Sequence, residues 1–290
     1  MEAEKANFPV ALMCEVLEVS RSGYYAWSKR PPATRTQENQ QLKEQIKEIH
    51  QKSRNSYGAP RIHAALKQEG FEVGRHRVAR LMSKLGICVQ PKRKFKTTTD
   101  SNHSFPTAEN VLNRNFTTQE PDQAWVADIT YIPTQQGWLY LAVVIDLFSR
   151  RVVGWSMADH MRVELVLNAL EAALGHRVPA TSGLLFHSDR GSQYASSNYR
   201  AALQKAGIGC SMSRKGNCWD NAVAESFFGT LKTELIKSRV FDTTEKAKST
   251  IVEWIEVFYN RERLHSTLHY LPPVQFEEQY WASQRQSTAA

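Results

Sequence analysis

Cysteine is scarce in this sequence, and its spacing excludes the scaffolds that depend on it. The 290 residues include only four cysteines, and no two of them form a C-x-x-C pair. A disulfide framework or a zinc module would need a denser or paired arrangement. We therefore expect free thiols at Cys14, Cys88, Cys210 and Cys218.

Long apolar runs are also missing. No stretch reaches the roughly 18 consecutive apolar residues that a membrane-spanning helix requires. The N-terminus places Glu2 and Glu4 before a short mixed segment and lacks the basic-then-apolar order of a secretion signal. We therefore expect a cytoplasmic protein that does not contact a membrane. Hydrophobic residues make up 41% of its 290 residues, enough for two or three globular domains.

An excess of acidic residues is absent as well, and the formal net charge is +8. Residues 1–100 contain 19 Lys and Arg against 10 Asp and Glu, whereas residues 101–290 contain 18 against 19. Clustered Lys and Arg gain free energy by displacing counterions from phosphates. Nucleic acid is therefore the expected partner of the first third, with a well-solvated basic surface as the alternative.

Residues 1–35 predict a small helical segment. Two short helices around a turn are expected over residues 8–30, because apolar side chains recur there at helical spacing and Ser20 and Ser22 can cap the second helix. The double proline that follows ends this helix, since proline does not continue one.

Residues 36–90 predict a helical DNA-binding domain. A helix over 36–53 is followed by two shorter ones over 61–68 and 75–85, with a glycine-bounded turn between them. This arrangement resembles a helix-turn-helix, whose second helix enters the major groove of DNA. We expect three side chains of that helix to contact DNA: Arg75, Arg77 and Arg80.

Residues 91–121 predict a linker, because a basic cluster is followed by Thr, Ser, Asn and Pro. The cluster either tracks the DNA backbone or is simply part of a solvated connector. Its basic residues are Lys92, Arg93, Lys94 and Lys96.

From residue 122 the pattern changes to strands mixed with helices. Strands are expected at 126–132, 139–147, 152–157, 183–187 and 208–212. Helices are expected at 162–174, 194–206, about 217–237 and 245–262. Three antiparallel strands followed by two parallel strands, added through crossover helices, is the ribonuclease-H-like order. We therefore predict an α/β core over 122–282 with a five-stranded mixed sheet and flanking helices, and a frayed tail over 283–290.

Two acidic residues are expected to meet in this fold. Asp128 lies within the apolar first strand, where a charged side chain needs a partner. Asp189 directly follows the fourth strand. Because the first and fourth strands are neighbours in this topology, the two carboxylates should converge.

A third acid, Glu225, lies on a predicted helix with two distinct faces. At about 100° per residue, Asn221, Glu225, Gly229 and Lys232 fall on the side away from the apolar arc. Gly229 is expected to leave that side open between the acid and the lysine. The apolar arc consists of Val223, Ala224, Phe227, Phe228, Leu231 and Leu235.

Three carboxylates that approach one another repel unless a cation lies among them. Oxygen ligands without a Cys or His set favour Mg²⁺ or Mn²⁺ over zinc. Two such ions can activate an attacking oxygen and stabilise the leaving one in phosphoryl transfer. The alternative is that each acid separately forms a cap or an ion pair.

Other titratable residues nearby predict structural roles. Asp146, which ends the second strand, is expected to support either the catalytic acids or the fold, and Asp220 to cap the Glu225 helix at its positive end. His187 is expected to be packed and hydrogen-bonded rather than a general base.

The acids lie in three blocks: W-V-A-D-I-T at 125–130, H-S-D-R-G-S-Q-Y at 187–194, and D-N-A-V-A-E-S-F-F-G-T-L-K-T-E at 220–234. These blocks resemble those of the IS-three family of bacterial insertion-sequence transposases, specifically the product of the second of two overlapping reading frames. Asp189 and Glu225 are separated by 35 residues, as in the D,D(35)E group that includes retroviral integrases, and Lys232 follows seven residues later. Segments 20–25, 57–62 and 259–273 are similar to the same family.

The resemblance implies an integrase-like catalytic core in which Asp128, Asp189 and Glu225 bind two Mg²⁺ or Mn²⁺ ions and Lys232 contacts DNA. The implied reaction is cleavage at the element end, which frees a 3′-hydroxyl, followed by attack of that hydroxyl on another phosphodiester. The implied partners are double-stranded DNA from element ends and target, further copies of the chain on DNA, and the upstream-frame (orfA) product. A nucleoid-associated bacterial protein is therefore expected.

Two alternatives remain open at this point. A ribonuclease-H-like nuclease would hydrolyse DNA without joining it. A DNA-binding component with little activity of its own would need fusion to an upstream-frame partner, or would only regulate transposition. Intact acids at all three positions favour an enzyme over a binding component, whereas only the reaction products separate hydrolysis from joining.

Overall fold

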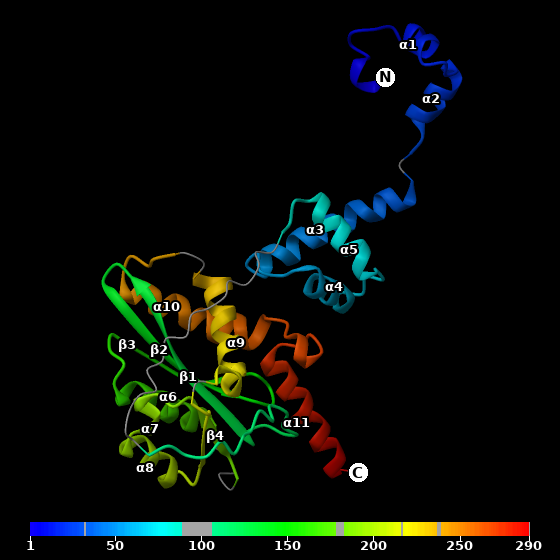
Figure 1. Ribbon diagram of the computed structural model, residues 1–290. Helices are drawn as coiled ribbons and strands as arrows, with labels where there is room; N and C mark the ends of the chain where they lie inside the picture. The colour runs from blue at the N-terminus through cyan, green and yellow to red at the C-terminus, as the bar shows by residue number, and fades with distance from the viewer. Residues whose placement is uncertain (32, 89–105, 178–182, 216, 237–238, 290) are drawn as a thin grey trace.

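The computed structural model describes residues 1–290 except 32, 89–105, 178–182, 216, 237–238 and 290. The chain begins with a small helical segment that stands apart from the rest (Figure 1). In it, the hydroxyl of Ser20 accepts the backbone N–H of Gly23 at 3.0 Å, as predicted for a cap. Cys14, Cys88 and Cys210 are free. The elements of this segment are a 3₁₀ turn (Glu2–Glu4), α1 (Val10–Val16) and α2 (Arg21–Lys29).

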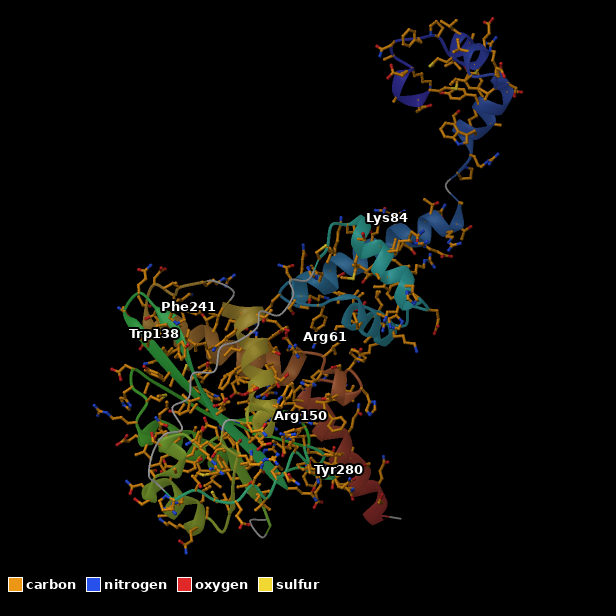
Figure 2. The ribbon with its side chains drawn as sticks, viewed as in Figure 1. Arg61, Lys84, Trp138, Arg150, Phe241 and Tyr280 are labelled. Carbon is orange, nitrogen blue, oxygen red and sulfur yellow. The ribbon has the colours of Figure 1, made fainter. Side chains whose placement is uncertain are left out.

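The next three helices form one packed unit that rests on the C-terminal half of the chain (Figure 1). They are α3 (Thr34–Lys52), α4 (Ala59–Gln68) and α5 (Arg75–Lys84). The backbone N–H of Leu264 donates to the Tyr57 hydroxyl at 2.6 Å, and the Arg61 guanidinium donates to the Leu264 carbonyl at 2.9 Å. Figure 2 shows Arg61 at this junction. The predicted DNA-binding domain therefore shares a core with the rest of the protein.

The five predicted strands are present and form one mixed sheet. Its strand order is β3-β2-β1-β4-β5. β1 pairs antiparallel with β2 and parallel with β4, β2 pairs antiparallel with β3, and β4 pairs parallel with β5. This is the ribonuclease-H-like arrangement expected from the sequence. The strands are β1 (Ala124–Thr134), β2 (Gly137–Asp146), β3 (Val152–Ala158), β4 (Leu185–Ser188) and β5 (Gly209–Met212).

Helices cover both faces of the sheet (Figure 1). One face packs on α6 (Val163–His176), α7 (Ser192–Ala195) and α8 (Ser197–Lys205). The other packs on α9 (Ala222–Leu231), α10 (Thr244–Glu253) and the π-helical segment Trp254–Glu262. A 3₁₀ turn (Ser266–Leu268) and α11 (Pro273–Ala289) follow. None of the described helices is both long and apolar enough to cross a membrane.

Gly154 allows α6 to lie unusually close to β3. A Cβ atom at this position would lie 2.3 Å from the Ala169 carbonyl oxygen and 2.6 Å from the Ala173 Cβ. We expect Gly154→Ala to lower the free energy of unfolding by about 1–3 kcal/mol, the usual cost of overpacking a core. Thermal melting measures the change. The matched control is Gly175→Ala on α6, where an added Cβ would meet nothing within 4 Å. This variant should be as stable as the wild type or more stable. Equal melting temperatures for both variants would contradict the prediction.

Three predicted helices are interrupted. The helix predicted over 245–262 becomes π-helical from Trp254. The helix predicted over 194–206 is split at Ser196, whose backbone is extended and whose hydroxyl accepts the N–H of Tyr199 at 3.2 Å. Serine there starts a new helix because it caps better than it propagates. The helix predicted over about 217–237 begins as the 3₁₀ turn Cys218–Asn221 and widens after Leu231 into the π-helical turn Lys232–Ile236.

The C-terminal end also differs from its prediction, because α11 continues through the segment expected to be a frayed tail. This helix is fixed by the buried carboxylate of Glu277, which accepts from Arg151 at 2.9 Å and also pairs with Arg177. These arginines lie 126 and 100 residues earlier in the chain. A local sequence pattern does not reveal such a partner.

Candidate active site

Asp128 and Asp189 are brought together by the pairing of β1 with β4. Ala127 lies opposite Ser188 in the parallel register, so the two aspartates are the next residues on neighbouring strands. Both line one cavity of about 260 Å³. The predicted strand order therefore gives the predicted convergence of these two side chains.

The electrostatics of this pair are those of crowded like charges. Burial raises the pKa of Asp128 well above its usual range, and the charge of Asp189, followed by that of Glu225, raises it further. The N–H of Ile129 donates to Asp128 Oδ1 at 2.8 Å and partly offsets this. Asp189 Oδ1 accepts the N–H of Gly191 at 2.9 Å. A cation placed between the aspartates would relieve their repulsion.

Glu225 lies on the helix that flanks this pair but does not line the cavity. The side-chain amide of Asn221, just before α9, donates to the Ala127 carbonyl at 3.1 Å and fixes the helix against β1. Glu225 itself is exposed, and partial desolvation raises its pKa. Within the described part of the chain, no three Asp, Glu, His or Cys side chains are arranged to hold one metal ion. The structure thus joins two of the predicted acids and leaves the third beside them.

The two-faced character predicted for the Glu225 helix is present in part. Asn221, on the predicted polar side, is buried, and Val223, on the apolar side, is half-buried. Ala224, Phe227, Phe228, Leu231 and Leu235 are buried as expected. Gly229, expected to leave an open surface, is buried. The Thr233 hydroxyl donates to its carbonyl oxygen at 2.7 Å and lies against it.

Lys232 reaches across to the edge of β1. Its amine lies 5.1 Å from the centre of the Tyr131 ring. Burial lowers the pKa of Lys232, and the charge of Asp128 partly restores it. The charges of Lys232 and Asp128 therefore act on each other.

Asp146 and His187 have the structural roles predicted for them. Asp146 is fully buried and accepts from the backbone and hydroxyl of Ser149, both at 2.8 Å, while burial raises its pKa to about 6. His187 lies between the hydroxyls of Ser211 and Ser213 at 2.8 and 3.2 Å, and burial lowers its pKa to about 4. A neutral imidazole held on both nitrogens is a packing residue.

Asp220 does not cap α9 as predicted. It is buried and forms ion pairs with Arg214 and Arg114, each at 2.8 Å, and its hydrogen bonds with Arg214 hold its pKa well below the usual range. Asn110 also donates to it, at 2.8 Å. Residues 106–121 of the predicted linker are therefore packed on the core, where Leu112 is also buried.

The predicted DNA-contacting residues fall into three groups. Arg75 and Arg80 are exposed on α5. Arg77 is half-buried and donates to Glu38 at 2.8 Å and Asn39 at 3.0 Å, so its guanidinium joins α5 to α3. The basic cluster Lys92, Arg93, Lys94 and Lys96 lies outside the described residues.

Two polar atoms near the acids were missed by the sequence reasoning. The Tyr194 hydroxyl and the Asn221 Oδ1 atom are buried without a hydrogen-bond partner among the described residues. Burial raises the pKa of Tyr194 well above its usual range, and Tyr199, Asp128 and Asp189 raise it further. No spacing in the sequence distinguishes this tyrosine from other buried ones.

Asp128→Asn is expected to raise the melting temperature at pH 7 in the presence of a chelator. The change removes a half-buried charge that is repelled by Asp189 and Glu225, while an asparagine oxygen still accepts the Ile129 N–H. Thermal melting with EDTA measures it. Glu171→Gln, an exposed acid on α6, is the control and should leave the melting temperature unchanged. A lower melting temperature for Asp128→Asn would show that the carboxylate stabilises the fold.

Comparison with protein families gives matches in three segments. Residues 37–95 match the family described as HTH-like domain. Residues 118–218 and 206–273 match two families that are both described as Integrase core domain. The HTH-like match contains the helix trio α3–α5 apart from the start of α3, and the first integrase match begins shortly before the sheet.

Curated relatives align over nearly the whole chain. The chain is 47% identical over 268 residues to the "Insertion element IS600 uncharacterized 31 kDa protein" of Shigella sonnei, covering 92% of this chain and 98% of that protein. It is 41% identical over 279 residues to "Transposase InsF for insertion sequence IS3A" of Escherichia coli K12, covering 96% of each.

Solved structures similar to the chain are more distant. A chain from the structure of the simian T-cell lymphotropic virus intasome in complex with PP2A regulatory subunit B56 gamma is 19% identical with a TM-score of 0.46, covering 74% of this chain and 69% of that one. The HTLV-2 integrase catalytic core, solved with magnesium, is 15% identical with a TM-score of 0.42, covering 56% of this chain and 99% of that one.

Proposed function

Because this chain belongs to the IS3 family of insertion-sequence transposases, we propose that Asp128, Asp189 and Glu225 form the metal-dependent centre at which it cleaves and joins DNA strands. The protein is a DNA-binding transposase with an integrase core, and its class of reaction is polynucleotidyl transfer. The observation that supports the proposed centre most directly is the pair of adjacent aspartates that line one cavity beside the Glu225 helix.

The side chains around the cavity suit hydrated Mg²⁺ or Mn²⁺. Asp128 and Asp189 offer hard oxygen atoms whose repulsion a divalent cation would relieve. Glu225 would complete the ligand set by a change of side-chain rotamer. When bound, two ions would activate the attacking oxygen and stabilise the leaving oxygen.

The residues of the chain would position DNA for two successive displacements. In the first, a water oxygen bonds to the phosphorus at the element end, and the bond to the 3′ oxygen breaks, leaving a free 3′-hydroxyl. In the second, that hydroxyl loses its proton and bonds to a target phosphorus, and the target strand releases its own 3′ oxygen. Lys232, at the strand edge beside Asp128, would bind a phosphate oxygen next to the reacting group.

Recognition of DNA would fall mainly to the first third of the chain. Arg75 and Arg80 on the exposed side of α5 are placed to reach a groove or its phosphates, and the basic cluster at 92–96 would add backbone contacts. The two ends of the element must be held together while they are joined to the target. We therefore include a homo-oligomer on DNA in the proposal. The upstream-frame (orfA) product is the other proposed partner.

The test uses a labelled duplex that carries the inverted repeat flanking the coding frame, a supercoiled target plasmid and Mg²⁺. Transposase activity gives labelled target of increased length, which EDTA abolishes. Labelled fragments without joined product would instead identify a nuclease. Binding with neither product, even after addition of the upstream-frame protein, would reduce the chain to a DNA-binding component.

A further inference from the structure

Two exposed aromatic rings stand in contact on the β1–β2 hairpin. In the antiparallel register Tyr131 lies opposite Tyr140, and Trp138 lies opposite Pro133, so all four side chains share one face of the sheet. The Tyr131 and Trp138 ring centres are 4.9 Å apart, with the planes at 88°. Tyr131 is 37% exposed and Trp138 53% exposed. Much apolar ring surface therefore faces water.

This exposure begins where the helical layer on that face ends. Along β1, alternate residues of the same face are Trp125, Ala127, Ile129 and Tyr131. The first two are at most 1% exposed beneath α6 and its neighbours, Ile129 is half-buried, and Tyr131 is exposed. The aromatic pair thus extends an apolar surface out of the core and up to the hairpin tip, where Figure 2 shows Trp138.

The pair is continuous with the acid cavity. Tyr131 lines the same 260 Å³ cavity as Asp128 and Asp189, and it lies three residues, or about 10 Å, from Asp128 along the strand. In the described strands, β4 pairs with β1 only as far as Ala127. Past that point the Lys232 amine reaches around the edge of β1 and lies 5.1 Å from the centre of the Tyr131 ring. Two rings, a cation and two carboxylates from four segments of the chain therefore lie around the free edge of β1.

We propose that Tyr131 and Trp138 form a stacking platform for unpaired bases of the DNA strand whose phosphate is held at Asp128 and Asp189. This inference rests on the proposed function and adds the state of the DNA to it. Opening of the base pairs next to the reacting phosphate makes that strand flexible enough to bend into a recessed cavity, and aromatic side chains stabilise the opened bases in a way that tolerates any sequence. Lys232 would neutralise a phosphate between the platform and the acids.

The competing explanation is that the rings only stabilise the hairpin. Cross-strand aromatic pairs do so in many sheets, and such a role would involve no nucleic acid. The chain contains a matched pair for comparison on α11. There the Tyr280 and Trp281 ring centres are 5.0 Å apart with planes at 73°, and Trp281 is 45% exposed. Figure 2 shows Tyr280 far from Trp138.

The experiment measures the affinity of the full chain for a fluorescein-labelled single-stranded oligonucleotide and for the duplex of the same sequence. Fluorescence anisotropy is recorded without divalent ions, so the result does not depend on catalysis. Variants are Trp138→Ala, Trp138→Phe and Trp281→Ala, each with a thermal melt. Trp138→Ala should bind the single strand about 5- to 150-fold more weakly, the range for loss of one stacked base, and the duplex within about twofold. Trp138→Phe should retain most of the affinity, and Trp281→Ala should match the wild type.

The result that overturns the inference is an unchanged single-strand affinity for Trp138→Ala, or an equal loss for single strand and duplex. If a variant melts at a lower temperature than the wild type, its affinity is not interpreted. The wild-type chain is then cross-linked to an oligonucleotide that contains 5-iodouracil. Cross-links at Tyr131 or Trp138 support the platform, and cross-links confined to other residues refute it. If the platform is absent but the chain still joins DNA, only this inference fails. If single strands bind as expected but no joining occurs, the proposed function fails instead.

Discussion

Replacing Asp189 with asparagine is expected to lower the Mg²⁺-dependent rates of end cleavage and strand joining about 1,000-fold or more. Asparagine keeps an oxygen to accept the Gly191 N–H, so the turn after β4 should persist. It removes one of the two adjacent charges that would hold the cations, and loss of several kcal/mol of transition-state stabilisation gives a factor of this size. Rates are measured by gel separation of cleaved and joined products. DNA affinity should change by less than about twofold, because α5 lies outside the cavity.

The control is Glu171→Gln, which removes an exposed acid from α6 and should leave both rates unchanged. A measurement without DNA separates loss of metal binding from loss of DNA binding or of the reaction itself. Mg²⁺ or Mn²⁺ should raise the melting temperature of the wild-type protein, because an ion that binds only the folded state stabilises it, and Asp189→Asn should lose most of this rise. Full activity in Asp189→Asn would remove the proposed centre.

Glu225→Gln tests the acid that the structure leaves outside the cavity. If Glu225 is the third ligand, the variant should lose activity to the same extent as Asp189→Asn, since a site built from three carboxylates fails when any one is neutralised. The rate of joining measures this. Activity close to wild type in Glu225→Gln alone would reduce the centre to the aspartate pair.

The order of the sheet and the convergence of Asp128 with Asp189 could be predicted because both depend on local patterns. Runs of β-branched and apolar residues indicate strands, and the order of the strands follows from a small set of allowed connections. Once β1 and β4 are neighbours, residues that end the paired segments must lie side by side. The burial of His187 and Asp146 likewise follows from their places within or at the end of apolar strands.

Other features depend on partners far away in the chain, and local patterns could not predict them. Arg77 has the sequence context of a DNA-contacting residue, but it binds Glu38 and Asn39 of another helix. The C-terminal helix is fixed by Glu277 to arginines at least 100 residues earlier. Asp220 pairs with Arg114 of a segment that reads as a solvated linker.

The way the helix trio α3–α5 rests on the core decides how DNA binding should be tested. Tyr57 and Leu264 are joined by a hydrogen bond across 207 residues of sequence, and the trio shares its hydrophobic core with the helices behind the sheet. Deleting residues 1–100 would expose that core, so a loss of DNA affinity would not separate lost contacts from lost folding. Substitution of exposed side chains avoids the problem.

Replacing Arg75, Arg80 and Lys84 with alanine is expected to flatten the salt dependence of DNA binding. All three side chains are exposed on α5, so their removal should leave the packed side of the helix intact. If each neutralises one phosphate, the slope of log K against log salt should fall in magnitude by about 2.7. Between 50 and 200 mM salt the wild type would then lose about 40-fold more affinity than the variant does. Anisotropy titrations of duplex DNA at several salt concentrations measure both slopes.

The matched control is a triple alanine variant of Lys205, Lys246 and Arg285, which removes the same charge from exposed positions on α8, α10 and α11. Both variants have the same net charge, so an effect of net charge alone would change their slopes equally. A direct contact through α5 predicts a flatter slope only for Arg75, Arg80 and Lys84. Equal slopes in the two variants would contradict a direct contact through α5. A flatter slope in the control alone would move the main DNA contact from α5 to the surface of the core, because counterion release reports only cations that lie against phosphates.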